Sequence, residues 1–315
     1  MKFLSGIYAA GVAARNTLYD RGALSAHRLS VPVVSVGNIS VGGAGKTPFV
    51  MLLCELLARR GIRVAVLSRG YGRASRGVRV VDPNGSARDF GDEPLLIARK
   101  LNVPVVVGED RYRAGLVAER EFSPQIILLD DGFQHRALAR DFDIVLLTPA
   151  DAHDRVLPAG RLREPLSALA RADAIVVSSG ASPADFPVAG KTIWRALRGI
   201  NPGPLPPRPV VFCGIARPEF FFTQLRKAGV EPAAEASFRD HHPYNDRDVA
   251  ELLALRAQSE GDGFVTTEKD CVNLGQLAGK LQPLVTVPVR MKLENADSAL
   301  DHMLATLKQR GAEVK

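Results

Sequence analysis

The sequence contains no uninterrupted apolar run long enough to cross a bilayer. A transmembrane helix needs about 18 or more consecutive apolar residues, and no stretch of the 315 residues reaches that length. Cysteine is scarce as well, since Cys54, Cys213 and Cys271 lie far apart and form no C-x-x-C pair. We therefore expect reduced structural thiols, with no disulfide framework and no zinc site.

Aromatic residues are also few, at 6% of the chain, and the lysines and arginines are scattered. This composition argues against a stacking surface for nucleic acid, so no nucleic-acid partner is expected. The net charge of +7 is compatible with an anionic lipid, a nucleic acid or a nucleotide, and by itself it selects none of them. The length and the 46% hydrophobic content are enough for a substantial core and favour two α/β domains over one.

A glycine-rich segment between a predicted strand and a predicted helix is the most informative feature. It reads SVGGAGKT, follows the apolar run Val31 to Val36 and precedes the helical pattern Pro48 to Leu57. A strand, a glycine-rich turn and a helix form the setting of a phosphate-binding P-loop. The glycines let backbone N–H groups point at phosphate oxygens, while Lys46 supplies a charge for the β- and γ-phosphates and Thr47 a hydroxyl for Mg²⁺.

The loop departs from the usual Walker A pattern at one position. Its first glycine is replaced by Ser40. A connection that ends in Lys-Thr by chance is the competing interpretation, and the flanking strand and helix patterns disfavour it. The residues expected to contact the nucleotide are Ser40, Val41, Gly42, Gly43, Ala44, Gly45, Lys46 and Thr47.

An apolar run that ends in two aspartates has the form of a Walker B strand. It extends from Ile126 to Leu129 and is followed by Asp130 and Asp131. An acid at the end of a buried strand beside a P-loop normally acts on Mg²⁺ or on the attacking group. The alternative is a pair of solvated acids in a turn before Gly132. The sequence does not decide which of the two aspartates touches the metal.

Two polar segments allow both a structural and a catalytic interpretation. Asp92 lies at the start of a predicted helix, Glu93 to Leu101, where acids are common for capping reasons. It is equally suited to take the proton from an attacking hydroxyl, as kinases require. The cluster Asp240-His241-His242 is a weak metal pattern without a third ligand. Asp240 is also suited to cap the following helix. A histidine in this cluster is suited to support a carboxylate base from across the domain cleft.

Several arginines are candidates for bidentate phosphate contacts. Arg69 lies in the loop SRGYGR, Arg111 begins a predicted helix, and Arg163 precedes Glu164 in the segment GRLREP.

Strand and helix patterns alternate through most of the chain, which predicts an α/β fold with a doubly wound, mostly parallel sheet of the P-loop NTPase type. Ligands bind such sheets outside the carboxyl ends of the strands, so the P-loop, the Arg69 loop and the two aspartates should share one face. The proline-dense segment 201–209 predicts a linker. We expect an N-terminal helix over 1–29, a P-loop core over 30–200 and a smaller C-terminal α/β domain over 210–315.

The first 29 residues show near-helical spacing of apolar side chains with basic residues between them. The apolar positions are Phe3, Leu4, Ile7, Tyr8, Val12, Leu18 and Tyr19, and the basic ones are Lys2, Arg15, Arg21 and Arg28. The pattern is typical of an amphipathic helix in a membrane interface. It fits equally a helix packed on its own protein. A signal peptide is disfavoured, because the apolar stretch is short and broken by Ser5 and Gly6.

Taken together, these segments resemble the tetraacyldisaccharide 4'-kinases, the lipid A 4'-kinases. The shared segments, in order, are VPVVSVGNISVGGAGKTPFV, SRGYGR, GDEPLLIA, LLDDGFQH, PAGRLREPL, DHH and TTEKD. The resemblance runs from the N-terminal helix to about Lys269, and the family is similar in lacking the first Walker glycine. It implies a P-loop core, a smaller C-terminal α/β domain and an N-terminal helix that rests on the inner membrane.

The resemblance implies ATP-dependent phosphorylation of the 4'-hydroxyl of an acylated glucosamine disaccharide 1-phosphate to give lipid IVA, with ATP and Mg²⁺ as cofactors. It also implies a peripheral protein at the cytoplasmic face of the inner membrane. A tetraacylated substrate leaves the bilayer only at a cost of about 0.8 kcal/mol per buried CH₂. The enzyme must therefore meet this substrate at the membrane surface, which favours the interface interpretation of the first helix.

By motif, the resemblance makes Asp92 the catalytic aspartate. It makes His241, rather than His242, its partner, because His241 directly follows Asp240. Lys46 completes the expected catalytic set.

The resemblance also implies that Asp130, Asp131 and Glu164 are acidic residues on the metal side, where Thr47 is expected as well. Arg111 and Arg163 are implied as phosphate contacts, and Arg69 is a further candidate.

Two other functions are alternatives. A partner-controlled P-loop ATPase, of the partitioning or cofactor-insertion type, shares GG-x-GKT. Such chains usually carry a lysine just before the two glycines, where this chain has Val41. A soluble small-molecule kinase would pack the first helix internally and would not partition to membranes.

Overall fold

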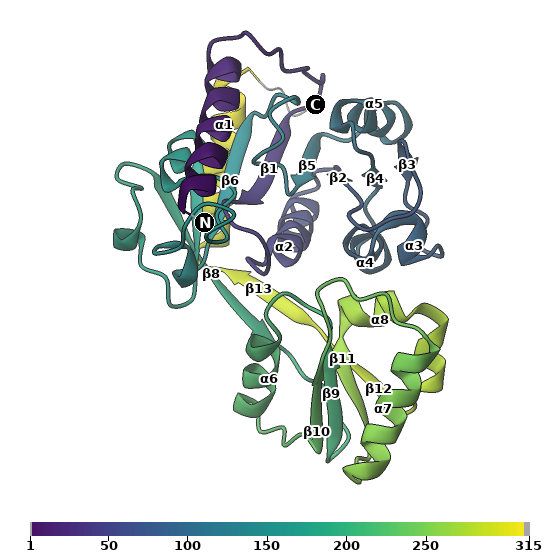
Figure 1. Ribbon diagram of the computed structural model, residues 1–315. Coiled ribbons are helices and arrows are strands. Elements are labelled where there is room, and N and C mark those ends of the chain that lie inside the picture. Colours follow the sequence, from purple (N-terminus) through teal and green to yellow (C-terminus); the bar gives the residue numbers. More distant parts are fainter. Residues whose placement is uncertain (1, 312–315) are drawn as a thin grey trace.

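The computed structural model describes residues 2–311 and contains two β-sheets in this part of the chain. The larger unit is built on a nine-stranded sheet and the smaller unit on a four-stranded sheet. Figure 1 shows the two units side by side. The candidate site lies where the two units face each other.

The larger sheet is mostly parallel, as the alternating pattern predicts. In spatial order its strands are β13 (Val289–Leu293), β8 (Thr192–Ile200), β7 (Ala174–Ser178), β6 (Phe142–Leu147), β1 (Val33–Asn38), β5 (Ile126–Asp130), β2 (Val64–Ser68), β4 (Val105–Val107) and β3 (Arg79–Val80). Only the edge pairs β13–β8 and β3–β4 are antiparallel. Because β5 lies between β1 and β2, the three loops expected to carry the site leave adjacent strands at their carboxyl ends.

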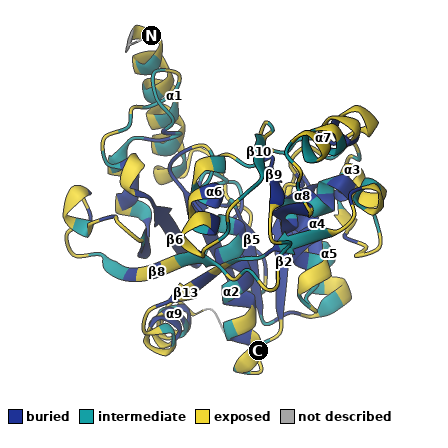
Figure 2. Ribbon diagram, turned by 90° about the horizontal axis from the view of Figure 1, so that it is seen from below, coloured by how far each residue is buried: buried dark blue, intermediate teal, exposed yellow. Residues whose placement is uncertain are grey.

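Both faces of this sheet are buried, since its central strands carry apolar side chains on both sides. Helices α2 (Lys46–Arg59), α4 (Asp92–Lys100) and α9 (Ala296–Gln309) contribute to the core on one face, and the single turn α3 (Ala87–Phe90) precedes α4. Helix α5 (Arg111–Phe122) and residues 162–188 contribute on the other face. The central strands of this sheet are accordingly dark blue in Figure 2, whereas β8 is largely teal and yellow.

The smaller sheet is entirely parallel. Its strands, in spatial order, are β10 (Ala234–Ser237), β9 (Pro209–Cys213), β11 (Gly263–Thr267) and β12 (Leu284–Val287). Its helices are α6 (Pro218–Lys227), α7 (Asp246–Gln258) and α8 (Glu268–Leu274).

The smaller unit ends earlier than the expected boundary at residue 315. After β12 the chain returns to the larger unit, where β13 pairs with β8 and α9 buries apolar side chains in the core. The apolar stretch from Val285 to Val289 does not form a single strand. Pro288, which has no N–H to donate, separates two strands that belong to different sheets. The smaller unit therefore spans residues 209–287 and is inserted between β8 and β13.

Helix α1 (Lys2–Asp20) lies on the surface of the larger unit, and Figure 2 shows it projecting from the body of the molecule. Near its start, the Phe3 and Ile7 side chains are 79% and 57% exposed. Near its end it is docked, since Asp20 pairs with Arg136 at 2.7 Å. Within residues 2–311 we find no helix whose length and apolar content would let it span a membrane.

Candidate active site

A cavity of about 760 Å³ opens between the carboxyl ends of the central strands of the larger sheet and the smaller unit. The P-loop and the ends of β2 and β5 line it on one side, and the loop after β10 and the start of α8 line it on the other. The polar and charged residues of the lining include Lys46, Thr47, Arg69, Asp92, Arg111, Asp130, Asp131, Gln134, Arg163, Arg198, His241 and Lys269.

The P-loop folds as the sequence predicts. Three of its glycines have positive φ angles, which L side chains rarely adopt. These are Gly42 (78°), Gly43 (56°) and Gly45 (85°). Helix α2 begins at Lys46, two residues before the expected start. Lys46 and Thr47 therefore lie in the first helical turn, where free N–H groups and the helix dipole favour an anion.

Lys46 and Asp131 belong to one charged cluster. The Lys46 Nζ atom lies 3.2 Å from Asn38 Oδ1 and 3.5 Å from Asp131 Oδ1. Arg163 donates to both Asp131 oxygens, at 2.9 and 2.7 Å. Burial alone would raise the pKa of the Asp131 carboxyl, but Lys46 and Arg163 hold that pKa well below its usual range. Asp131 is therefore ionised, and its oxygens are already engaged by cations.

Asp130, at the end of β5, has a different environment. Its side chain is buried, Ser68 Oγ donates to its Oδ2 atom at 3.4 Å, and its Oδ1 atom has no hydrogen-bond partner in the structure. Burial, reinforced by the Glu93 and Asp131 carboxylates, raises the pKa of Asp130 to about 7. A buried carboxylate oxygen without a partner is a group that a bound cation would satisfy.

Asp92 and His241 come from different units and meet in the cavity. His241 Nδ1 lies 3.0 and 2.9 Å from the two Asp92 oxygens, and Asn273 donates to Asp92 Oδ2 at 2.9 Å. Burial would raise the pKa of Asp92, but the His241 hydrogen bond and the Lys269 charge lower it. Burial would lower the pKa of His241, but its hydrogen bond with Asp92 and the Asp92 charge raise it. Asp92 is thus an ionised carboxylate held by an imidazole.

Local backbone conformations aim this pair at the cavity. Gly91 has a φ of 89° directly before α4, and a Cβ there would lie 3.1 Å from both Gly70 Cα and Tyr71 O. Only glycine fits this close approach, which sets Asp92 as the first residue of the helix. His241 has a φ of 56°, which is uncommon for a residue with a side chain.

The structure separates the two neighbouring histidines. His242 does not line the cavity; its Nε2 atom lies 3.0 Å from Asp248 Oδ2, and its ring stacks on Phe238. Asp240 does not cap α7 and instead accepts a hydrogen bond from Lys269 at 3.0 Å. His241 is therefore the histidine that faces Asp92.

All three candidate phosphate-binding arginines, Arg69, Arg111 and Arg163, line the cavity. Arg111 is only 6% exposed and donates to the Glu109 carbonyl oxygen at 2.7 Å. Burial and the nearby Arg69 charge lower the pKa of Arg111. Cations held this close together favour an anionic ligand.

The cavity is also lined by two cationic side chains that the sequence analysis did not identify as site residues. Arg198, on β8, donates to the Gly43 carbonyl oxygen at 3.0 Å, and burial together with Arg217 lowers its pKa to about 10. No signal pointed to it, because β8 itself was not expected. Lys269 follows the carboxyl end of β11, and its Nζ atom lies 3.3 Å from His241 Nε2. The position of Lys269 just after a predicted strand, in the segment TTEKD, was the sequence feature that could have indicated a site residue.

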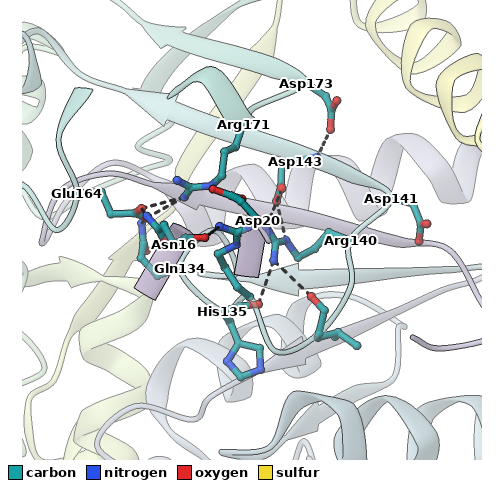
Figure 3. Close-up of polar contacts among 12 residues, drawn as sticks. Asn16, Asp20, Gln134, His135, Arg140, Asp141, Asp143, Glu164, Arg171 and Asp173 are labelled. Carbon is teal, nitrogen blue, oxygen red and sulfur yellow. Dashed lines mark hydrogen bonds and ion pairs between the residues drawn. The ribbon is translucent and has the colours of Figure 1, made fainter. Parts of the chain in front are cut away.

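Glu164, expected on the metal side, lies elsewhere. It is fully buried and is not among the residues that line the cavity. Figure 3 shows its carboxylate held by Asn16, Gln134 and Arg171, at 2.8 to 3.0 Å. Arg163 and Glu164 are adjacent in sequence but point into different surroundings, which the motif alone could not reveal.

The oxygen ligands at the P-loop fit Mg²⁺. Among residues 2–311, no three Cys, His, Asp or Glu side chains are arranged to hold a metal ion by themselves. Mg²⁺ usually binds through one or two carboxylates together with substrate phosphates and water. The Thr47 hydroxyl and the unpartnered Asp130 oxygen are hard ligands of this kind beside the phosphate-binding loop.

Comparisons with known proteins identify the family to which the chain belongs. The chain matches the family model described as tetraacyldisaccharide-1-P 4'-kinase over residues 1–308. Tetraacyldisaccharide 4'-kinases from Koribacter versatilis and Aquifex aeolicus are 50% and 42% identical to it, over 98% and 82% of this chain and 99% and 84% of theirs. A crystal structure of LpxK from Aquifex aeolicus in complex with ATP matches with a TM-score of 0.80 and 38% identity, over 96% of this chain and 97% of that one. As its motifs predicted, the chain belongs to the tetraacyldisaccharide-1-P 4'-kinase family.

Proposed function

We propose that this protein transfers the γ-phosphate of ATP to the 4'-hydroxyl of an acylated glucosamine disaccharide 1-phosphate. One observation carries the proposal: an ionised Asp92, held by His241 of the other unit, faces the same cavity as the P-loop. A base and a phosphate-binding loop in one cavity are the two parts that phosphoryl transfer to an alcohol requires.

In this mechanism Asp92 accepts the proton of the 4'-hydroxyl. The hydroxyl oxygen bonds to the γ-phosphorus, the bond from that phosphorus to the bridging oxygen breaks, and ADP leaves. His241 fixes the orientation of the Asp92 carboxylate through Nδ1. Lys269, which lies close to both residues, keeps Asp92 ionised while the hydroxyl approaches.

The phosphates of ATP bind between the P-loop and the arginines. Lys46, at the start of α2, interacts with the β- and γ-phosphates, and Arg69, Arg111 and Arg163 neutralise charge around the transferred group. Asp130 and Thr47 would hold Mg²⁺, which would supply further neutralisation of the phosphate oxygens. Asp131 remains paired with Lys46 and Arg163 and orients them.

The proposed substrate class supports a location at a membrane surface. Helix α1 presents apolar side chains near its start, at Phe3, Leu4 and Ile7, and these are 79%, 54% and 57% exposed. Apolar residues on an exposed helix with basic residues nearby favour binding in the interface of an anionic bilayer. We therefore infer a peripheral enzyme on the cytoplasmic face of the inner membrane, with α1 as its contact.

Incubation with ATP, Mg²⁺ and lipid A disaccharide 1-phosphate tests the proposal. Mass analysis should find one added phosphate on the disaccharide, and the Lys46→Ala variant should give none. ATP hydrolysis that leaves the lipid unmodified would contradict the proposal and would favour the partner-controlled ATPase.

A further inference from the structure

The buried carboxylate of Glu164 is bound entirely by protein groups. Its Oε1 atom accepts hydrogen bonds from Gln134 at 2.9 Å and from Arg171 at 3.0 Å. Its Oε2 atom accepts from Arg171 at 2.9 Å and from Asn16 at 2.8 Å. Arg171 balances the buried charge, and the two amides complete its hydrogen bonding. This arrangement leaves Glu164 no free oxygen with which to bind a metal or a substrate.

The donors come from three separate parts of the chain, as Figure 3 shows. Asn16 belongs to α1, Gln134 to the turn after β5, and Arg171 to the end of a short 3₁₀ helix. Glu164 is therefore a junction at which the N-terminal helix is joined to two segments of the larger unit.

The junction continues to the P-loop lysine. The same Gln134 amide that donates to Glu164 also donates to the Asn38 carbonyl oxygen at 2.9 Å. The Asn38 side-chain oxygen lies 3.2 Å from Lys46 Nζ. Consecutive contacts thus link Asn16 of α1, through Glu164, Gln134 and Asn38, to the amine at the centre of the phosphate site.

We propose that Glu164 is a positioning residue that couples the seating of α1, through Asn16, to the orientation of Lys46. This inference rests on the proposed function and adds a role for the membrane-facing helix in turnover. Small displacements of a catalytic group lower the rate strongly. If Glu164 moves, the Gln134 amide is held only by the Asn38 carbonyl oxygen and is free to rotate away. With α1 seated, Gln134 keeps its hydrogen bond to the Asn38 carbonyl oxygen. The Asn38 side chain, which also accepts a hydrogen bond from Arg163, then holds Lys46 at the phosphate position.

The first test removes the contact from the α1 side. Asn16→Ala should lower kcat about three- to tenfold, because a hydrogen bond to a buried charge is lost, with the KM for ATP little changed. Asp20→Asn is the matched control. Asp20 docks the same helix one turn later through Arg136 and does not touch Glu164. Its kcat should stay within about twofold of wild type, as expected for an ion pair whose carboxylate is 58% exposed.

Two outcomes of this comparison overturn the inference. Equal losses of kcat in both variants would mean that α1 docking in general, and not this link, sets the rate. A rise in the lipid KM alone in Asn16→Ala, with kcat intact, would mean that the helix only binds substrate. Thermal melting of each variant shows that the fold is kept.

A second test separates positioning from metal binding. Glu164→Gln should lower kcat while the Mg²⁺ concentration that gives half-maximal rate stays the same, whereas a metal ligand would require more Mg²⁺. If Glu164→Gln fails to fold, Asn16→Ala and Gln134→Ala are combined instead. The double variant should lose less than the product of the single losses, because both act through one carboxylate; multiplicative losses refute the link.

An NMR experiment tests the positioning without any lipid. In protein labelled with [¹³Cε]lysine, the Lys46 signal is identified by its absence in Lys46→Arg. That signal should shift in Asn16→Ala and stay in place in Asp20→Asn. An unshifted signal in Asn16→Ala contradicts the inference, even if the lipid kinase activity is present. A shift combined with no lipid phosphorylation would keep the link and reject the proposed function.

Discussion

Replacing Asp130 by asparagine should stabilise the protein while it abolishes phosphoryl transfer. Asp130 is buried, and its carboxyl has a pKa of about 7 because of burial and the Glu93 and Asp131 charges. The unfolded chain would give the same group its ordinary pKa of about 3.9. Below pH ~4 both states hold the proton and the folded state carries no penalty. As the pH rises from ~4 to ~7 the unfolded state loses its proton first, so the free energy of unfolding falls.

The size of the effect follows from the two pKa values. At about 1.36 kcal/mol per pH unit, the difference between about 3.9 and the folded value corresponds to a penalty of up to about 4 kcal/mol above pH ~7. Asparagine removes the charge and keeps an oxygen that accepts from Ser68, which now donates to Asp130 Oδ2. The gain in unfolding free energy should therefore be near zero at pH ~4 and reach up to about 4 kcal/mol at pH ~8.

Urea unfolding at several pH values, without nucleotide or metal, measures this gain. Asp131→Asn is the matched control of opposite sign, since Lys46 and Arg163 lower the pKa of Asp131. That variant should be destabilised at neutral pH, with the difference fading as the pH falls through the folded pKa. A destabilised Asp130→Asn at pH ~8, or a gain that does not change with pH, would refute the reasoning.

Two further predictions concern the phosphate site and the membrane. Lys46→Ala should lower kcat about 10²-fold or more, because removing a group that stabilises charge in the transition state has an effect of this size in other enzymes. Its melting temperature should stay close to that of wild type. Turnover at the wild-type rate would exclude Lys46 from the mechanism. Phe3→Ser combined with Ile7→Ser should weaken binding to anionic vesicles at least about tenfold, since each apolar side chain contributes about 2 kcal/mol when buried, and ATP binding should be unchanged. Co-sedimentation of this variant equal to wild type would exclude α1 as the membrane contact.

The sequence predicted the larger unit well because its signals are local. The P-loop, its flanking strand and helix, and the apolar run before Asp130 each lie within a few residues of one another. A parallel sheet was predicted to bring three loops together at the carboxyl ends of its strands, and the observed strand order does so. The fold class and the family were therefore accessible from the sequence alone.

The parts that were missed depend on contacts distant in sequence. The segment TIWRALRGI mixes charged and apolar residues, and it becomes β8 only by pairing with β7 and with β13, which lies beyond the smaller unit. Arg198 enters the site through that strand. Glu164 carries a carboxylate of the kind that binds a metal. Only the structure shows that Asn16 of α1 and Arg171 occupy this carboxylate and that it lies outside the cavity. The two DHH histidines are neighbours in the sequence, and only the fold shows that His241, which has a positive φ, contacts Asp92 while His242 contacts Asp248.

The most direct test of the central claim is a kinetic cycle on the pair that joins the two units. Asp92→Ala and His241→Ala should each lower kcat, by about 10²- to 10⁴-fold for the loss of a general base and less for the loss of its partner. The double variant should then fall little further than Asp92→Ala, because residues that act as one unit are not additive. Multiplicative losses in the double variant, or an unchanged kcat in Asp92→Ala, would contradict the account.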